Sequence, residues 1–373
     1  MLILSEDQKL LMASARGAVA EKAPIAEFRN LRADPNGLGF SPAFWRASAE
    51  LGWTGVLVPE AFGGLDFGVV GAGLIAREMA REVALSPFLS TSVLSASALA
   101  RAGSREQNAD WLPRIARGEA IVAFALDEGS RHGAIATMAT RTGGGWRLDG
   151  VKQFVLDGHA ADAMLIAAKA GDEAALFLAT ADAAGLSRDA RTLVDGRRVA
   201  TVTLDGVLVG ADARLEGGAA TIEEVVDVGR AVISAALCGV TEEAFARTAR
   251  YLKERRQFDR RIGSFQALQH RAARVHIEIE NAWSATLQAL QSIEARANSA
   301  AFDVAIAKAK ASETACAATA ECLQMHGGIG MTDEFDIGLF LKRARVDSVL
   351  FGDAAFHADR VATMLGMVSR KSC

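Results

Sequence analysis

The stretch that decides the architecture is RYLKERRQFDRRIGSFQALQHR, residues 250–271, which carries six arginines and one lysine. A basic run of this kind is usually a solvated face. The aromatics Tyr251, Phe258 and Phe265 recur every seven residues, which favours one packed helical face. Arginines near a helix end can instead hold phosphate groups through paired hydrogen bonds. Both interpretations place this stretch in or beside long helices.

The chain around this stretch is suited to long helices, because the last of its six prolines is Pro113 and proline breaks helices. Apolar residues recur at helical spacing over 221–256 and 261–295, and the alanine-rich segment 299–326 continues the pattern. Such stripes are buried most simply when antiparallel helices pack together. We therefore predict a C-terminal four-helix bundle over residues 214–373.

Two further zones precede the bundle. Residues 1–119 are predicted to be helical, with capping boxes at Ser5–Gln8 and Ser104–Gln107 and an N-cap at Ser41 before Pro42. Residues 120–213 change to short β-rich runs separated by turns such as GGG and DG, which predict a small antiparallel barrel or sandwich. The predicted fold is thus α+β and mostly α, with a helical N-terminal domain, a middle β-domain and a C-terminal bundle.

Composition narrows the class of protein. A net charge of −4 gives no reason to expect binding to nucleic acid or to a membrane surface, and no apolar run reaches the roughly 18 residues of a membrane span. The four cysteines have irregular spacing and include Cys316 and Cys322 in the alanine-rich segment, so they are interpreted as buried apolar residues rather than disulfide partners or metal ligands. We expect a cytoplasmic globular protein without a metal site.

Two motifs together resemble those of the acyl-CoA dehydrogenase family. The first is R-x-Q-F-x-x-x-I-x-x-F-Q-x-x-Q, beginning at Arg255, and the second is Q-x-x-G-G-x-G, beginning at Gln324. The resemblance covers the whole chain. It implies non-covalently bound FAD, oxidation of acyl-CoA thioesters to trans-2-enoyl-CoA, and electron-transfer flavoprotein as the electron acceptor. It also implies a dimer or tetramer built through the C-terminal bundle.

The resemblance also implies a set of cofactor-binding positions. Those matched to the FAD pyrophosphate and nucleotide, contributed across a subunit interface, are Arg255, Gln257, Phe258 and Gln266. Those matched to the loop on the adenylate side are Gln324, Met325, His326, Gly327 and Gly328. Those matched to the flavin edge and its shielding aromatic are Phe124, Leu126, Asp127, Phe154 and Leu156. Without the resemblance, the Gly327-Gly328 pair is more simply explained as the end of a helix.

The chain departs from the family at the flavin edge. Asp127 and Leu156 stand where threonine or serine hydroxyls are usual, Phe154 replaces a tryptophan, and the loop after the first strand reads GSRHGA. Each lost hydrogen bond contributes roughly 0.5–1.5 kcal/mol. We therefore expect weaker or altered flavin binding by these strands.

The largest departure is in LFGDAAFH, residues 350–357. The family's usual catalytic base is a glutamate directly before a Gly-Thr pair, and the matching residue here is Phe351, followed by Gly352 and Asp353. The α-proton of a thioester is only weakly acidic, so a carboxylate must remove it while hydride passes to the flavin. Phe351 can still offer its backbone N–H to the thioester carbonyl, but it has no proton acceptor.

Few other positions can supply the base. Some family members carry it one residue before an arginine that matches Arg230, and that position is Gly229. Asp353 and Asp227 are the remaining candidates. Asp353 is more simply explained as a helix cap or as a partner of Arg343 or Arg345. Asp227 is expected to contact substrate or Arg230 rather than to act as the base. His357 is expected to be a packed core histidine.

The pattern FGDxx[FY]H resembles the small subunit of pimeloyl-CoA dehydrogenases and the subunits of steroid side-chain dehydrogenases. Those proteins often work in heteromers with a glutamate-bearing paralogue, so fatty-acid or steroid catabolism and a hetero-oligomer are implied. Three hypotheses stay open. The chain is an acyl-CoA dehydrogenase or a subunit of one, a non-catalytic subunit that stabilises its partner, or a flavin oxidase or monooxygenase on the same fold.

Overall fold

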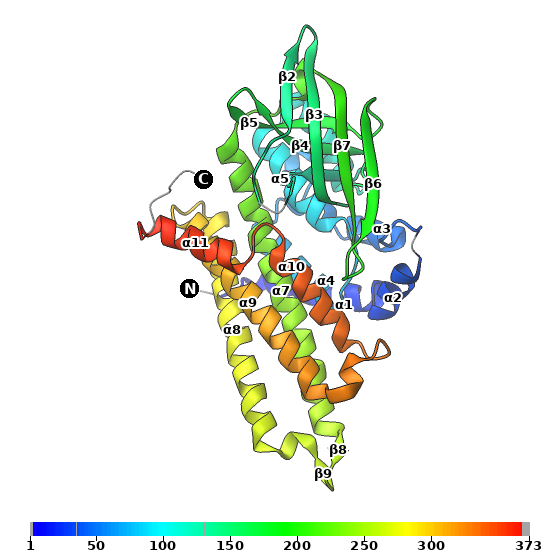
Figure 1. Cartoon of the computed structure of the whole chain (residues 1–373), viewed down its shortest axis with the longest axis vertical. Helices are drawn as coiled ribbons and strands as arrows, with labels where there is room; N and C mark the ends of the chain where they lie inside the picture. Colours follow the sequence, from blue (N-terminus) through cyan, green and yellow to red (C-terminus); the bar gives the residue numbers. More distant parts are fainter. Residues whose placement is uncertain (1–2, 35, 130–131, 368–373) are drawn as a thin grey trace. The chain divides into compact units, whose positions relative to one another are not determined.

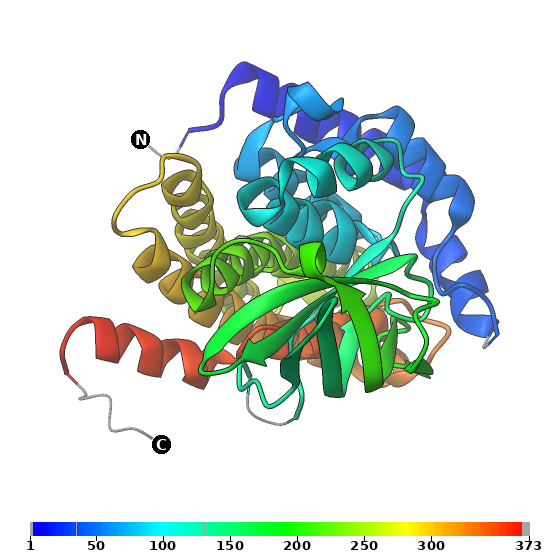
Figure 2. The same ribbon diagram turned by 90° about the horizontal axis from the view of Figure 1, so that it is seen from above.

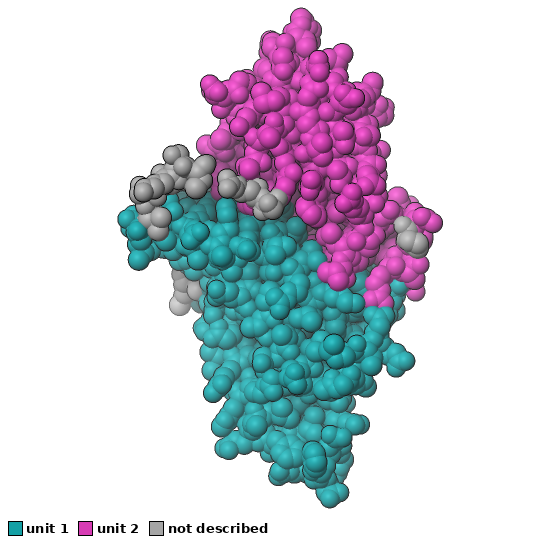
Figure 3. Space-filling model, in the orientation of Figure 1, with its two compact units in different colours: residues 1–29, 69–84, 230–373 teal, residues 30–68, 85–229 magenta. Residues whose placement is uncertain are grey.

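The computed structural model describes residues 3–34, 36–129 and 132–367. These residues form two compact units (Figure 3). Unit 1 comprises residues 1–29, 69–84 and 230–373, and unit 2 comprises residues 30–68 and 85–229. Within the described ranges, no helix is long and apolar enough to cross a membrane.

Unit 1 is helical, as predicted for the C-terminal segment. Its helices are α1 (Glu6–Lys22), α2 (Ile25–Ala33), α4 (Gly68–Arg81), α7 (Ala219–Glu254), α8 (Gln266–Glu294), α9 (Ala300–His326), α10 (Ile337–Val349) and α11 (Ala354–Met364). Parts of α2, α4 and α7 belong to unit 2. The capping box at Ser5–Gln8 is confirmed, because the Ser5 hydroxyl and the Gln8 side chain each accept the other's backbone N–H.

Helix α9 lies at the centre of this unit, where it packs against α8, α10 and α11 (Figure 1). Its buried face is rich in alanine, and small side chains let neighbouring helices approach closely. Ion pairs add specificity around α4: the buried Glu78 accepts from Arg16 at 2.9 Å, and Arg77 bonds Glu242 and stacks on the Trp283 ring. The bundle therefore combines a tightly packed apolar core with paired charges.

Helix α7 ends before the basic stretch does. Residues Arg256–Gln257 (β8) and Arg260–Arg261 (β9) form a two-stranded hairpin, followed by the short 3-10 helix η5 (Ile262–Ser264). At its tip Phe258 and Asp259 have positive φ angles of 53° and 62°. The prediction of one helical face for Tyr251, Phe258 and Phe265 is therefore wrong, because the chain reverses direction between the first and the last of them.

Unit 2 contains helices and the sheet. Its helices are α3 (Pro42–Glu50), α5 (Ala96–Ala102) and α6 (Arg105–Ala116), with the short 3-10 helices η1 (Trp53–Gly55), η2 (Glu60–Phe62) and η4 (Ala211–Ala213), and the π-helix η3 (Phe88–Ser95). The caps predicted at Ser41 and at Ser104–Gln107 are both confirmed.

The seven-stranded sheet is curled (Figure 2). Its strands are β1 (Val122–Ala125), β2 (Met138–Thr142), β3 (Gly145–Leu156), β4 (Ala163–Ala170), β5 (Glu173–Thr180), β6 (Leu186–Thr192) and β7 (Arg198–Gly210). The order is β1-β4-β2-β3-β7-β6, with β5 paired to β4. Most pairs are antiparallel, whereas β1 and β2 pair with β4 in parallel. One core cluster, including Trp146 and Phe177 in edge-to-face contact at 5.2 Å, fills the sheet's interior.

The change from helix to strand falls between α6 and β1, and the change back to helix falls between β7 and α7. The mostly helical α+β fold is thus as predicted. The division into three domains stays a prediction, because the two compact units divide the chain differently.

Candidate functional site

Phe351 lies in a short turn between α10 and α11; this turn and the last two residues of α10 are together called the 348–353 turn. Its side chain is buried and its φ angle is 58°, a left-handed conformation that is strained for a bulky residue. Its carbonyl oxygen accepts a hydrogen bond from Arg230 Nε at 3.0 Å and lies 3.1 Å from His357 Nε2. The position at which the family has its glutamate is therefore occupied by Phe351, and Arg230 and His357 both contact the backbone carbonyl of this residue.

His357 is fully buried on α11, as predicted for a core histidine. Burial lowers the pKa of His357 to about 2, and the nearby positive charges of Arg230 and Lys308 add to this effect. The imidazole is therefore neutral, and the nitrogen that faces the Phe351 carbonyl must carry the proton and donate it. His357 thus acts as a hydrogen-bond donor to the turn rather than as a base.

Asp353 is exposed and forms the N-cap of α11. Its Oδ1 accepts the backbone N–H of Phe356 at 2.8 Å. This is the capping role that the sequence allowed as an alternative. A catalytic role for Asp353 stays a prediction.

The two remaining candidates near this position lie on α7. Arg230 is almost completely buried, at 1% exposure, and Asp227 is buried one turn earlier in the helix. The Arg230 guanidinium also lies over the Phe356 ring at 5.6 Å. Arg230 therefore contributes to holding the 348–353 turn, while a substrate contact for Asp227 stays a prediction.

The second cofactor motif is at the end of α9. Gly327 ends this helix with a φ angle of 67°, and its N–H bonds the Gln324 carbonyl. Met325 and His326 are buried, and His326 stacks on Tyr251 near the end of α7 at 4.5 Å. The hairpin and the glycine pair consequently lie at the same end of the bundle (Figure 1).

Both motifs at this end are open to an external ligand. Arg255, Gln257 and Gln266 are exposed, and the Phe258 side chain is 82% exposed. A Cβ added at Gly327 or Gly328 would meet no atom of the chain within 4 Å. Gly327 is explained by its φ angle, but Gly328 has no such internal reason. Exposed arginines beside open backbone suit a phosphate-bearing group.

The flavin-edge positions lie in unit 2. Phe124, Leu126 and Leu156 are buried in or directly after β1 and at the end of β3. Phe154 lies in a register shift between β3 and β7, where its φ angle is 55° and its side chain is 54% exposed. An exposed aromatic on a strained bulge is an unusual feature of a strand end, and bulges commonly re-aim side chains at functional sites.

Asp127 is already engaged within the chain. Its Oδ1 bonds His132 Nδ1 at 2.9 Å and accepts the Gly133 N–H at 3.2 Å. Burial raises the pKa of Asp127, but the hydrogen bond and charge of His132 outweigh burial and hold the pKa below its ordinary value. A hydroxyl donor at this family position is therefore replaced by an ionised acceptor.

A buried lysine links the two flavin-edge segments, and the sequence analysis missed it. Lys152 Nζ donates to the Leu126 carbonyl at 3.1 Å and to Glu128 at 2.5 Å. Glu128 also accepts the backbone N–H groups of Ala136 and Thr137. The sequence gives no clear signal for it, because the same strand run also contains Arg147 and Asp149, and a charged residue in a strand is normally assumed to be exposed.

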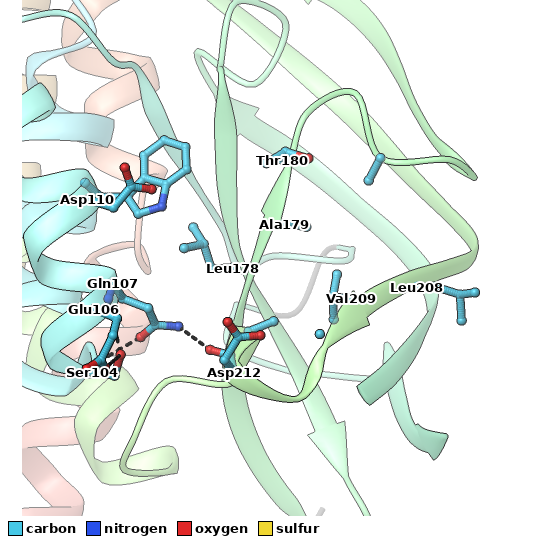
Figure 4. A pocket seen from close by; sticks show the side chains of 14 residues that line it. Ser104, Glu106, Gln107, Asp110, Leu178, Ala179, Thr180, Leu208, Val209 and Asp212 are labelled. Carbon is cyan, nitrogen blue, oxygen red and sulfur yellow. Dashed lines mark hydrogen bonds between the residues drawn. The ribbon is translucent and has the colours of Figure 1, made fainter. Parts of the chain in front are cut away.

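A groove of about 760 Å³ in unit 2 lies elsewhere (Figure 4). It runs between α6 and the strands β5 and β7, and Gln107 Nε2 bridges to the Asp212 carbonyl at 2.7 Å beside it. None of the site residues predicted from sequence is among its lining residues. We assign this groove no role in the chemistry.

Comparison with known proteins decides the family. Residues 5–119 match the model described as acyl-CoA dehydrogenase, N-terminal domain, and residues 216–366 match acyl-CoA dehydrogenase, C-terminal domain. The chain belongs to the acyl-CoA dehydrogenase family. Its relatives include acyl-CoA dehydrogenase FadE27 of Mycobacterium tuberculosis, 31% identical over 87% of this chain and 88% of that protein.

Two solved structures of acyl-CoA dehydrogenases are similar over nearly the whole chain. A variant of the Tcur3481-Tcur3483 steroid ACAD is 32% identical, with a TM-score of 0.90 over 97% of this chain and 98% of that chain. The ChsE4-ChsE5 complex from Mycobacterium tuberculosis is 28% identical, with a TM-score of 0.93 over 99% of this chain and 100% of that chain. The chain is thus an FAD-dependent acyl-CoA dehydrogenase or a subunit of one.

For this acyl-CoA dehydrogenase the fit to FAD differs between the two units. The exposed arginines and open glycine backbone of unit 1 suit the pyrophosphate and nucleotide. In unit 2 the side chains at the flavin-edge positions offer no hydroxyl donor, because Leu156 is apolar and Asp127 is paired with His132. The nucleotide-binding half fits FAD well, whereas the flavin-edge half has lost side-chain donors.

Asp157, directly after Leu156, is a second group that the sequence analysis missed. The Ser90 hydroxyl lies 2.6 Å from Asp157 Oδ2 and 3.1 Å from the Pro87 carbonyl. A hydroxyl has one proton to donate and the carbonyl can only accept, so both contacts are satisfied together when Asp157 itself carries a proton. Burial raises the pKa of Asp157 to about 6, in agreement with this arrangement.

The Asp157 arrangement predicts a pH-dependent stability. Because its folded-state pKa is raised, the favourable contribution is complete below the ordinary aspartate pKa and is lost as the pH rises through about 6. Asp157→Asn, whose amide donates without charge, should therefore gain stability relative to wild type between about pH 5 and about pH 8, by at most about 3 kcal/mol. Urea unfolding at both pH values measures this, with the exposed Asp172→Asn as control. An equal difference at both pH values would contradict it.

Asp353 permits a clean separation of capping from catalysis. Asp353→Asn keeps a good N-cap and removes the carboxylate, whereas Asp353→Ala removes the cap at a cost of about 1 kcal/mol. We expect the asparagine variant to match wild type in melting temperature and in turnover by the assembled enzyme, and the alanine variant to melt lower. Turnover lost in Asp353→Asn with the fold retained would instead identify Asp353 as the base.

Proposed function

We propose that this chain is one subunit of a heteromeric FAD-dependent acyl-CoA dehydrogenase in which a glutamate-bearing paralogue supplies the catalytic base. The observation that carries the proposal is the state of the base positions. Phe351 and Gly229 hold no carboxylate, and the nearest remaining carboxylate on the turn, Asp353, caps α11. A chain without a positioned proton acceptor needs another source for that step.

The proposal assigns the hairpin to the partner's cofactor. Arg255, Gln257 and Phe258 project from the end of the bundle with exposed side chains, as a segment does when a second chain completes its site. In the family these positions hold the neighbour's FAD pyrophosphate. FAD bound there would accept the hydride removed from the substrate, while the residues of this chain bind and orient the nucleotide.

The proposal also retains substrate binding by this chain. The 348–353 turn keeps the backbone N–H of Phe351, and Arg230 and His357 hold that residue's carbonyl. A thioester carbonyl binds to such a preorganised donor. The substrate class is therefore an acyl-CoA thioester, and the similarity to a steroid acyl-CoA dehydrogenase favours a bulky, steroid-like acyl group. Electron-transfer flavoprotein as the acceptor is suggested by the family resemblance.

Co-expression tests the proposal directly. The chain is produced alone and together with a paralogue that has glutamate before Gly-Thr, and the two preparations are compared for subunit composition and for α,β-dehydrogenation of acyl-CoA. We expect a stable hetero-oligomer that is active, and no activity for the chain alone. Failure to co-purify, or full activity of the chain alone, would refute the proposal. Hydrogen peroxide formation with acyl-CoA would support the oxidase hypothesis instead.

Removing Arg255 should weaken cofactor binding. Arg255→Ala eliminates a charge-assisted contact to the pyrophosphate, worth roughly 1.5–3 kcal/mol, so the flavin content of the purified oligomer should fall by at least an order of magnitude on dialysis. Arg256→Ala is the matched control, because the Arg256 guanidinium bonds the Asp259 carbonyl within the hairpin. Unchanged flavin content in Arg255→Ala would contradict the assignment of the hairpin.

Restoring the carboxylate should restore base catalysis. Phe351→Glu places a proton acceptor at the family's position, so we expect the dehydrogenation rate of the assembled enzyme to rise above wild type. Phe351→Gln has nearly the same shape without the charge and should bring no gain. Equal rates for the two variants, with flavin still bound, would mean that the base lies elsewhere.

A further inference from the structure

Lys308 is a fully buried lysine in the middle of α9. Its ammonium donates to Ser312 Oγ at 3.0 Å, to the Ser348 carbonyl at 2.9 Å and to the Gly352 carbonyl at 3.0 Å. An ammonium has three N–H groups, so all three are used. Two of the three acceptors are backbone oxygens of the 348–353 turn.

This lysine is costly to bury, because its three hydrogen-bond partners are all neutral. Burial lowers the pKa of Lys308 to about 7, and the other charges around it act in both directions: Asp347 on α10, Asp353 at the cap of α11 and Cys316 on α9 raise the pKa, while Arg230 on α7 lowers it. An apolar side chain of similar length would fill the space at lower cost. A costly charge that is kept in a core points to a function beyond packing.

The 348–353 turn, to which Lys308 donates two hydrogen bonds, has a strained backbone. Phe351 has a φ angle of 58° and Gly352 one of 100°, and a Cβ at Gly352 would lie 2.4 Å from the Phe356 ring. Consecutive carbonyls are held by different donors, that of Phe351 by Arg230 and His357 and that of Gly352 by Lys308. The N–H of Phe351 belongs to the peptide plane before Phe351, which lies between the held Ser348 carbonyl and the held carbonyls of Phe351 and Gly352. Because peptide groups are planar, bonds on both sides of this plane limit its rotation.

We propose that Lys308 is a positioning residue for substrate binding: by holding the Ser348 and Gly352 carbonyls, it keeps the Phe351 N–H aimed at the thioester carbonyl of acyl-CoA. The inference rests on the proposed function, because it requires that this chain binds an acyl-CoA thioester. Lys308 itself touches no substrate atom in this account. Its effect passes entirely through the backbone of the turn.

Calorimetry on the full chain, with its partner subunit where the two co-purify, tests this with two probes. Butyryl-CoA has the thioester carbonyl, and its thioether analogue S-butyl-CoA lacks it, so the ratio of their Kd values isolates the carbonyl contact. We expect Lys308→Met to reduce the preference for the thioester by roughly threefold to tenfold, the equivalent of one hydrogen bond. Lys308→Arg, which keeps a charged donor, should restore most of the preference.

The matched control is Lys310→Met, two residues along the same helix, since the Lys310 ammonium pairs with Glu278 instead of the turn. If Lys308→Met does not fold, Lys308→Gln retains two N–H donors and serves in its place. The preference should also fall in wild type as the pH rises through about 7, because a neutral amine cannot bond all three acceptors, and it should not fall in Lys308→Arg.

The possible results distinguish the role of Lys308 from the proposed binding of an acyl-CoA thioester by this chain. Equal thioester preference in wild type and Lys308→Met would overturn the role of Lys308 while leaving the proposed function intact. A lower melting temperature in Lys308→Met with the preference unchanged would mean a merely structural lysine and would also overturn it. Absence of any thioester preference in wild type would remove the thioester site itself, and with it both the inference and the substrate-binding part of the proposed function.

Discussion

The rest of the site depends on one set of interactions, the hydrogen bonds that buried cationic side chains donate to backbone carbonyls of the 348–353 turn. Lys308 and Arg230 reach it from two different helices, α9 and α7, and neutral His357 adds a third donor from α11. Each of these groups is expensive to bury, and together they impose a left-handed conformation on Phe351. The turn is thus held by three donors, although the residue at the family's base position is Phe351.

The buried donors around the 348–353 turn distinguish this chain from a family member whose site has lost all function. A turn with no remaining role would be free to lose its buried charges, because apolar replacements would stabilise the bundle. The flavin-edge positions differ from the turn, since Asp127 is bonded to His132 and Leu156 offers no donor. The proposed function therefore assigns substrate positioning and nucleotide binding to this chain, and base catalysis to its partner. A heteromer distributes these tasks between subunits.

Much of the fold could be predicted from the sequence, because its signals are local. Capping boxes at Ser5 and Ser104 mark helix starts, and the absence of proline after Pro113 allows the long helices that are observed. The hairpin at 256–261 was missed because its aromatics happen to recur at a helical interval. The sheet's parallel pairs were missed because pairing direction depends on which strands meet, which no single segment encodes.

The site was only partly predictable, because some of its contacts join segments that are distant in the sequence. A family motif identifies Arg255 and Gly327 by spacing, and the glutamate's absence is visible in the letters themselves. Lys308, Lys152 and Asp157 carry no such signal, because a charged residue is ordinarily expected at the surface and their partners come from distant segments. Whether Asp353 caps or catalyses depends on the direction of one carboxylate, and the structure directs it to the Phe356 N–H.

The most direct measurement of the central claim is the visible flavin absorbance of the purified chain alone, reconstituted with FAD and mixed without oxygen with an acyl-CoA that the hetero-oligomer oxidises. The account predicts that the absorbance does not bleach, because Phe351 and Gly229 hold no carboxylate and Asp353 caps α11. It further predicts bleaching on addition of the glutamate-bearing partner. Bleaching by the chain alone would contradict the account and would show that the chain has a base of its own.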